Sequence, residues 1–136
     1  MTDLSKSMNI SAAGMKVQGE RLRVISENIA NAGSTALTPN DAPYRRKLVT
    51  FGTTLDRELG TNLVEVKKVS RDPSEFGQRY QPGHPAADAS GYVKTSNVNT
   101  LVEMTDMREA QRSYEANLRV MQAARTMLQR TIDLLR

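Results

Sequence analysis

The C-terminal third of the chain decides the fold, and it reads TLVEMTDMREAQRSYEANLRVMQAARTMLQRTIDLLR from Thr100 to Arg136. No Gly or Pro occurs after Gly91, so the two strongest helix breakers are missing from this stretch. Its opening, Thr100 to Glu103, fits a capping box, in which the Thr hydroxyl and the Glu carboxylate satisfy free N–H groups of the first turn. We therefore predict one long helix over residues 100–136.

Apolar side chains in this stretch recur every seven residues. Such a heptad pattern is typical of a helix that packs along a second helix. The recurring positions are Met107, Tyr114, Met121, Leu128 and Leu135, with Met104, Leu118 and Ile132 on an adjacent row and Ala110 and Ala124 on the other flank.

The N-terminal segment repeats the seven-residue pattern. Its positions are Met8, Met15, Leu22 and Ile29, with Leu4 and Ile25 on one neighbouring row and Ile10, Val17 and Val24 on another. Gly33 offers a stop at the C-terminal end of the helix. Gly14 and Gly19 each cost about 1 kcal/mol relative to Ala, so this helix needs a partner to remain folded.

Between the two helices lies a middle region that is rich in breakers. All five prolines fall between Pro39 and Pro85. Residues 47–55 and 62–69 have the composition and alternation of short strands, whereas residues 71–91 carry dense turn signals and predict a long ordered loop. The sequence thus predicts three parts, an N-terminal helix (1–33), a middle region (34–99) and a C-terminal helix (100–136).

The predicted fold class is mainly α, with the two terminal helices packed as a coiled coil around a middle insertion of short β-strands and an ordered loop. A length of 136 residues suits one domain. The alternative is an ordinary antiparallel helical hairpin, in which the apolar rows are only the core of the pair.

Composition excludes several classes of function. The chain has no Cys, so it has neither disulfides nor thiolate chemistry, and its only His is His84. A metal site of His84 with Asp72 and Asp88 has unpatterned spacing and is weakly indicated. No catalytic or phosphate-binding motif is present, which predicts a protein that is not an enzyme and holds no cofactor or metal.

The net charge of +4 is spread along the chain. Basic and acidic groups number 4 and 3 in residues 1–38, 9 and 7 in residues 39–100, and 6 and 5 in residues 101–136. We interpret the short basic runs, residues 45–47 and 67–68, as solvated strand or loop edges. A soluble basic helical protein that binds nucleic acid or an anionic membrane is the alternative function.

The apolar rows of the two helices point to assembly. One pairing buries one stripe of each helix, and the additional rows then face water, which usually marks an interaction site. A head-to-tail contact between copies gives a helical filament, whereas contacts with one other protein give a heteromeric module. Met at two of the five C-terminal heptad positions, Met107 and Met121, suits an interface with varied neighbours, although core filling explains it equally well.

Several strings of the sequence resemble the flagellar axial proteins of the rod and hook. The general signature is similar to RLRVISENIANAGST at residues 21–35. Resemblance to the proximal rod proteins within that family rests on further strings in the same order: PYRRKLVTF at 43–51, DPSEF at 72–76, YQPGHPAAD at 80–88, GYV at 91–93, NVN at 97–99 and EMTDMREAQRSYEAN at 103–117.

The resemblance implies a structural subunit of the bacterial basal-body rod. Such subunits polymerise with other rod proteins into a helical drive shaft in the periplasm, which transmits torque and conducts exported subunits. The implied partners are other rod proteins, the adaptor that joins the rod to the MS ring and export gate, and the type III export apparatus, with no nucleic acid and no direct membrane insertion. Export without a cleaved signal peptide agrees with an N-terminus that lacks a long apolar run.

The resemblance and the heptad rows together predict which residues contact neighbouring subunits. The predicted subunit-interface residues are Met8, Met15, Leu22, Ile25, Asn28, Ile29, Asn31, Met107, Tyr114, Asn117, Leu118, Met121, Leu128, Ile132 and Leu135.

Overall fold

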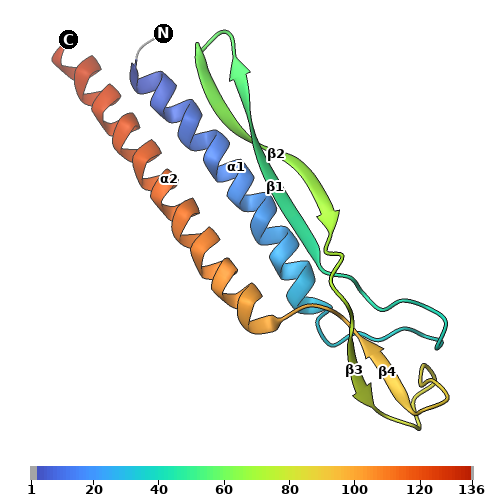
Figure 1. Ribbon diagram of the computed structural model, residues 1–136. Helices are drawn as coiled ribbons and strands as arrows, with labels where there is room; N and C mark the ends of the chain where they lie inside the picture. The colour runs from blue at the N-terminus through green and yellow to red at the C-terminus, as the bar shows by residue number, and fades with distance from the viewer. Residues whose placement is uncertain (1–2, 136) are drawn as a thin grey trace. The chain divides into compact units, whose positions relative to one another are not determined.

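The computed structural model describes residues 3–135 and consists of two long helices with four strands between them (Figure 1). In chain order the elements are α1 (Asp3–Ala30), β1 (Lys47–Asp56), β2 (Thr61–Arg71), β3 (Gly77–Tyr80), β4 (Tyr92–Thr95) and α2 (Thr100–Leu134). The expectation of a mainly α chain is correct only in part, because four strands of 10, 11, 4 and 4 residues accompany the helices.

The ends of the helices differ from the sequence-based prediction. α1 ends at Ala30 and not at Gly33, because the Ala32 N–H donates to the Ile29 carbonyl at 3.2 Å, three residues back instead of four, and the chain then turns. α2 is capped by Asn99, whose Oδ1 accepts from the backbone N–H groups of Leu101 and Val102 at 3.0 and 3.4 Å. The predicted capping box is therefore wrong, and the Glu103 carboxylate is available for another role.

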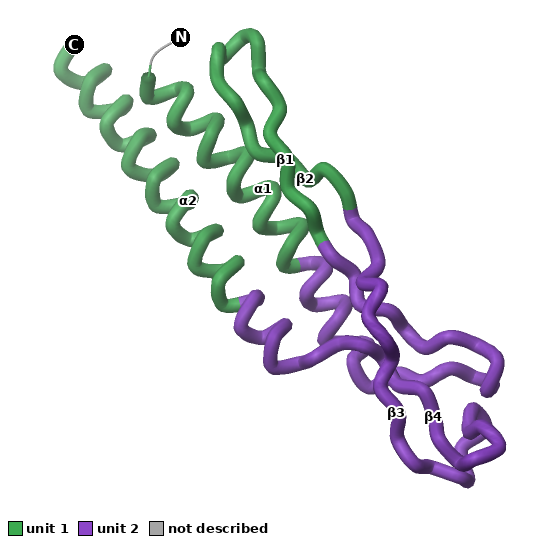
Figure 2. Tube along the Cα trace, in the orientation of Figure 1, with its two compact units in different colours: residues 1–22, 49–68, 108–136 green, residues 23–48, 69–107 purple. Residues whose placement is uncertain are grey.

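The described chain forms two compact units (Figure 2). Unit 1 comprises the described parts of residues 1–22, 49–68 and 108–136, and unit 2 comprises residues 23–48 and 69–107. Neither described helix is long and apolar enough to cross a membrane.

In unit 1, α1 and α2 run antiparallel and approach closely. Arg21 pairs with Glu109 at 3.1 Å, and a Cβ at Gly14 would lie only 2.7 Å from the Asn117 amide nitrogen. The buried positions of α2 in this unit are small, with Ala110 0% and Ala124 3% exposed. Small side chains therefore occupy the centre of the helix contact.

The predicted central row of α2 is displaced to the side of this contact. Met121 and Leu128, predicted at the centre, are only half-buried, whereas Ala110 and Ala124, predicted on the flank, are buried. Close approach of two helix backbones excludes large side chains from the line of nearest contact. The helices are paired, but the seven-residue repeat of large side chains marks the edge of the contact.

The other part of unit 1 is the hairpin of β1 and β2, which lies along α1. Asp56 Oδ1 accepts from the N–H groups of Glu58 and Leu59 at 2.9 and 3.0 Å, and Gly60 completes the turn at a φ of +62°. The two predicted strands are thus confirmed, each slightly longer than expected.

Unit 2 contains a second, smaller hairpin that the sequence did not reveal. Within the predicted loop of residues 71–91, β3 forms and pairs antiparallel with β4, so that Tyr80 faces Tyr92 with ring centroids 5.3 Å apart. Gly91, at a φ of +83°, leads into β4, and a Cβ there would lie 2.9 Å from the Tyr80 ring. Val93 of β4 is fully buried.

The turn at Gly91 gives a direct test of this hairpin. Gly91→Ala is expected to lower the free energy of unfolding by about 2–3 kcal/mol, because it adds a steric contact to a left-handed backbone conformation. Gly60→Ala is the matched control, since Gly60 is also left-handed but its Cβ would meet nothing within 4 Å, and we expect a loss of about 1 kcal/mol. Urea denaturation followed by tyrosine fluorescence measures both losses, and equal losses would contradict the steric explanation.

Candidate functional site

A cluster of polar side chains in unit 2 joins the end of α1, the start of β1 and the start of α2. We call it the polar cluster, and it consists of Asn28, Arg46, Asp72, Asn97 and Glu103. Glu103 and Asn28 are each only 1% exposed. Buried polar groups require hydrogen-bond partners, so this cluster constrains how its elements meet.

Asn28 uses the full hydrogen-bonding capacity of its side-chain amide. Its Nδ2 donates to the Lys47 carbonyl at 2.9 Å and to Glu103 Oε2 at 3.1 Å. Its Oδ1 accepts from the Tyr44 hydroxyl at 2.8 Å and from the Lys47 N–H at 2.9 Å. An amide has two donors and two acceptor sites, so all of them are engaged within the unit.

Arg46 brings three carboxylates together. Its Nε donates to Glu103 Oε1, its Nη1 donates to Asp72 Oδ2 at 3.3 Å, and its Nη2 lies 3.6 Å from Asp106 Oδ2. Burial alone lowers the pKa of the Arg46 guanidinium, but the hydrogen bonds and charges of Glu103 and Asp72 outweigh burial and raise that pKa above its ordinary value. The guanidinium is therefore held in its charged form.

The turn at residues 72–74 is held by Arg45 and Asn97. Arg45 Nη1 donates to the carbonyls of Asp72 and Ser74, both at 2.8 Å, and its guanidinium lies 4.2 Å from the centre of the Phe76 ring. Asn97 Oδ1 accepts from the Arg46 N–H at 2.7 Å, while its Nδ2 donates to the Ser74 hydroxyl at 3.0 Å.

The basic run at residues 45–47 was predicted to be solvated, and this interpretation is wrong. Arg45 and Arg46 are engaged as described above, and Lys47 Nζ pairs with Glu27 Oε2 at 2.7 Å. These partners are distant in sequence, for example 57 residues between Arg46 and Glu103, so no local pattern reveals them. The family resemblance could have pointed to the polar cluster, because its five residues come from five of the strings that carry the resemblance.

The histidine is also accounted for by local structure. His84 Nδ1 accepts from the Ala86 N–H at 3.0 Å, and Nε2 lies 3.2 Å from the Thr35 hydroxyl oxygen. Both ring nitrogens are thus engaged. Among residues 3–135, no group of three or more His, Asp or Glu side chains is arranged to hold a metal ion.

Comparison with known proteins gives the family. A family model described as the C-terminal region of flagellar basal body rod FlgEFG proteins matches residues 89–134. The flagellar basal-body rod protein FlgC of Agrobacterium fabrum is 54% identical over 136 residues, which cover 100% of this chain and 98% of that protein. The FlgC proteins of Bacillus subtilis and Salmonella typhimurium are each 36% identical, over 94% and 93% of this chain and 95% and 93% of their own lengths.

This chain belongs to the FlgC family of flagellar basal-body rod proteins. The resemblance inferred from the sequence strings is therefore confirmed. Family membership also confirms that the protein is a structural component and not an enzyme.

The predicted subunit-interface residues of this FlgC-family chain fall into three classes of exposure. Ile25 and Asn28 are buried, and Ile132 and Leu135 are 48% and 84% exposed. The remaining positions are half-buried: Met8, Met15, Leu22, Ile29, Asn31, Met107, Tyr114, Asn117, Leu118, Met121 and Leu128. Their contacts with other subunits stay predictions.

Removing the buried carboxylate tests the polar cluster. Glu103→Ala is expected to lower the free energy of unfolding by about 3 kcal/mol, because it removes the buried carboxylate that pairs with Arg46 and leaves one N–H of the buried Asn28 amide without its acceptor. Glu109→Ala removes an ion pair whose carboxylate is 64% exposed, and we expect a loss of less than about 1 kcal/mol. Urea denaturation measures both, and a Glu103 variant as stable as the control would contradict the role assigned to the cluster.

Acid should weaken the same region. Hydrogen bonds from Ser74, with a smaller contribution from Arg46, hold the pKa of Asp72 below its ordinary value of 3.8, and the hydrogen bond from Lys47 holds the pKa of Glu27 below 4.5. Since both pKa values are depressed by folding, their stabilisation is complete above about pH 5 and is lost as the pH falls through the folded-state values.

We therefore expect the free energy of unfolding to fall between about pH 5 and pH 3, and to fall less steeply in Asp72→Asn. Denaturation curves at a series of pH values measure the slopes. Glu75→Gln, which removes an exposed carboxylate near the same turn, is the control and should keep the wild-type slope. A wild-type slope in Asp72→Asn would rule out Asp72 as a source of the acid sensitivity.

Proposed function

We propose that this protein is a structural subunit of the flagellar basal-body rod, which polymerises with other rod proteins into the shaft that transmits torque and conducts exported subunits. The observation that carries the proposal is the amount of apolar helix surface that one molecule leaves exposed. Met127 and Leu134 of α2 and Leu135, which follows it, are 53%, 87% and 84% exposed. In a chain of a rod-protein family, such surface is suited to contacts between subunits.

The finer parts of the proposal follow the family resemblance. In the rod, the terminal helices would form a coiled-coil layer that includes the predicted subunit-interface residues. The neighbours would be other rod proteins and the adaptor that links the rod to the MS ring and export gate. The subunit would reach the periplasmic part of the basal body through the type III export apparatus, without a cleaved signal peptide.

Binding to nucleic acid or to an anionic membrane gains no support. Such binding requires basic side chains gathered on one free surface. Arg46 and Lys47 instead pair with carboxylates inside unit 2. No observation on the described residues favours this second function.

Complementation tests the proposal. In a strain that lacks its own FlgC-family protein, the wild-type chain should restore swimming and be recovered in purified basal bodies, whereas Leu135→Asp should reduce that recovery by about tenfold because it places a charge on the exposed apolar end of α2. Gln122→Asp, at an exposed polar position of the same helix, should behave as wild type. Absence of the wild-type chain from basal bodies that it has restored would refute the proposal.

A further inference from the structure

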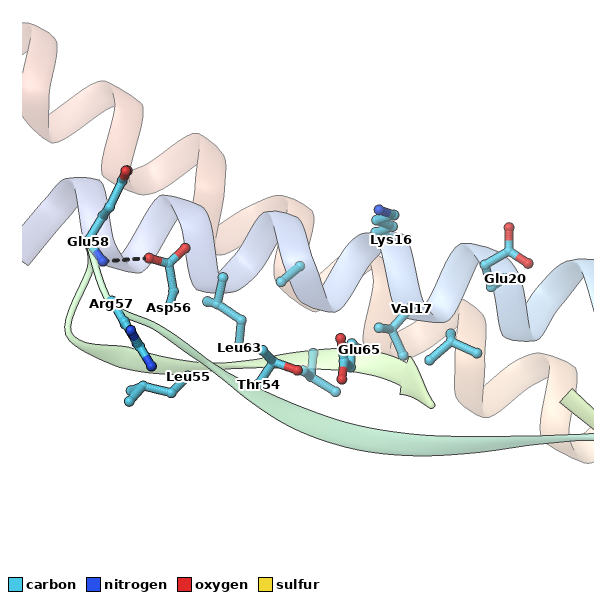
Figure 3. A pocket seen from close by; sticks show the side chains of 13 residues that line it. Lys16, Val17, Glu20, Thr54, Leu55, Asp56, Arg57, Glu58, Leu63 and Glu65 are labelled. Carbon is cyan, nitrogen blue, oxygen red and sulfur yellow. Dashed lines mark hydrogen bonds between the residues drawn. The ribbon is translucent and has the colours of Figure 1, made fainter. Parts of the chain in front are cut away.

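An apolar groove lies between α1 and the β1–β2 hairpin of unit 1 (Figure 3). Its volume is about 690 Å³, enough for several large side chains. Val17 of α1 and Leu63 of β2 face it, and Leu55 at its edge is 59% exposed. An exposed apolar hollow of this size on a small protein marks a contact site.

The charged residues around the groove are mostly acidic. Glu20, Asp56, Glu58 and Glu65 line it together with two basic residues, Lys16 and Arg57. The groove thus carries a net charge of −2. Its chemistry favours an apolar partner that also carries basic side chains.

The same chain has a surface with this chemistry on α2. Val120, Met127 and Leu134 are seven residues apart, so they form one stripe along the helix, and they are 47%, 53% and 87% exposed. We call them the α2 stripe. Residues 119–134 contain three Arg and one Asp, a net charge of +2 that complements the groove.

The α2 stripe does not reach the groove of its own molecule. Within unit 1, α1 lies between α2 and the hairpin (Figure 2). α2 contacts the face of α1 that carries Arg21, whereas the groove opens along the neighbouring face that carries Lys16 and Glu20. The complementary surface must therefore come from another molecule.

We propose that the groove of one copy receives the α2 stripe of a second copy of this chain. This inference rests on the proposed function and names the surfaces that join like subunits. We place this contact head-to-tail, so that a free groove and a free stripe remain at the two ends, whereas a reciprocal two-fold pairing would use both surfaces and stop at a dimer. Repetition of such a contact builds an open helical assembly, which is the architecture of a rod.

Cysteine cross-linking tests the contact directly, because the chain contains no native Cys. The purified full-length chain carrying Leu55→Cys and Met127→Cys is oxidised at high concentration and separated under non-reducing conditions. We expect a ladder of trimers and longer chains, formed at least about tenfold faster than in a mismatched pair, Leu55→Cys with Leu101→Cys. Leu101 is a suitable control because it also lies on α2 and is 73% exposed.

Several outcomes would overturn the proposal. Equal rates in the matched and mismatched pairs would show random collision, and an intramolecular disulfide in the matched pair would show that the stripe reaches its own groove. In basal bodies, exclusive cross-linking of the thiol introduced at position 55 to a different rod protein would assign the groove to that protein. None of these results affects recovery of the wild-type chain in basal bodies, which tests the proposed function separately.

Charge reversal provides a second measurement without cysteine. Glu65→Arg on the groove and Arg130→Glu beside the α2 stripe should each weaken self-association about tenfold, measured by sedimentation velocity. An equimolar mixture of the two variants should regain association, because each groove then meets a stripe of opposite charge. Glu75→Arg, in unit 2, is the control for a change of net charge. A mixture that associates no better than either variant alone would contradict the pairing.

Discussion

The buried carboxylate of Glu103 is the constraint on which unit 2 depends. The side chain is 1% exposed, and an ionised carboxylate at that depth is strongly destabilising unless a positive charge and further donors reach it. Arg46 supplies the charge, and the Asn28 amide supplies another hydrogen bond. The start of α2, the start of β1 and the end of α1 must therefore meet at one point, and the remaining contacts of unit 2 are arranged around that point.

A polar contact of this kind selects one arrangement more strongly than it adds stability. Replacing a buried ion pair by apolar side chains is often neutral or stabilising, because removing charges from water costs about as much as their attraction returns. A register shift would leave Asn28 and Glu103 buried without partners, whereas small apolar contacts tolerate such shifts. We interpret the cluster as the feature that specifies which part of α2 faces α1 within unit 2.

The local elements could be predicted from the sequence, and the contacts between them could not. The absence of Gly and Pro and the seven-residue spacing of apolar side chains predicted α2. The alternation of apolar and polar side chains predicted β1 and β2. Ala110 and Ala124 were predicted on the flank because the central row was chosen from the large apolar side chains that recur every seven residues. Close contacts between helices instead select small side chains. Arg46 was assigned to solvent because its partners lie up to 57 residues away, a distance that no periodicity reports.

The contact of the exposed apolar side chains of unit 1 with water is unfavourable in free energy, and assembly removes that contact. Leu134 and Leu135 are more than four-fifths exposed, and an isolated molecule with such surface tends to associate. The net charge of +4 opposes indiscriminate association, because like-charged subunits repel at long range. Specific contacts must then place opposite charges together at short range. The acidic groove and the basic flank of the α2 stripe meet that requirement with two different surfaces, so each added subunit offers the next one an unused site.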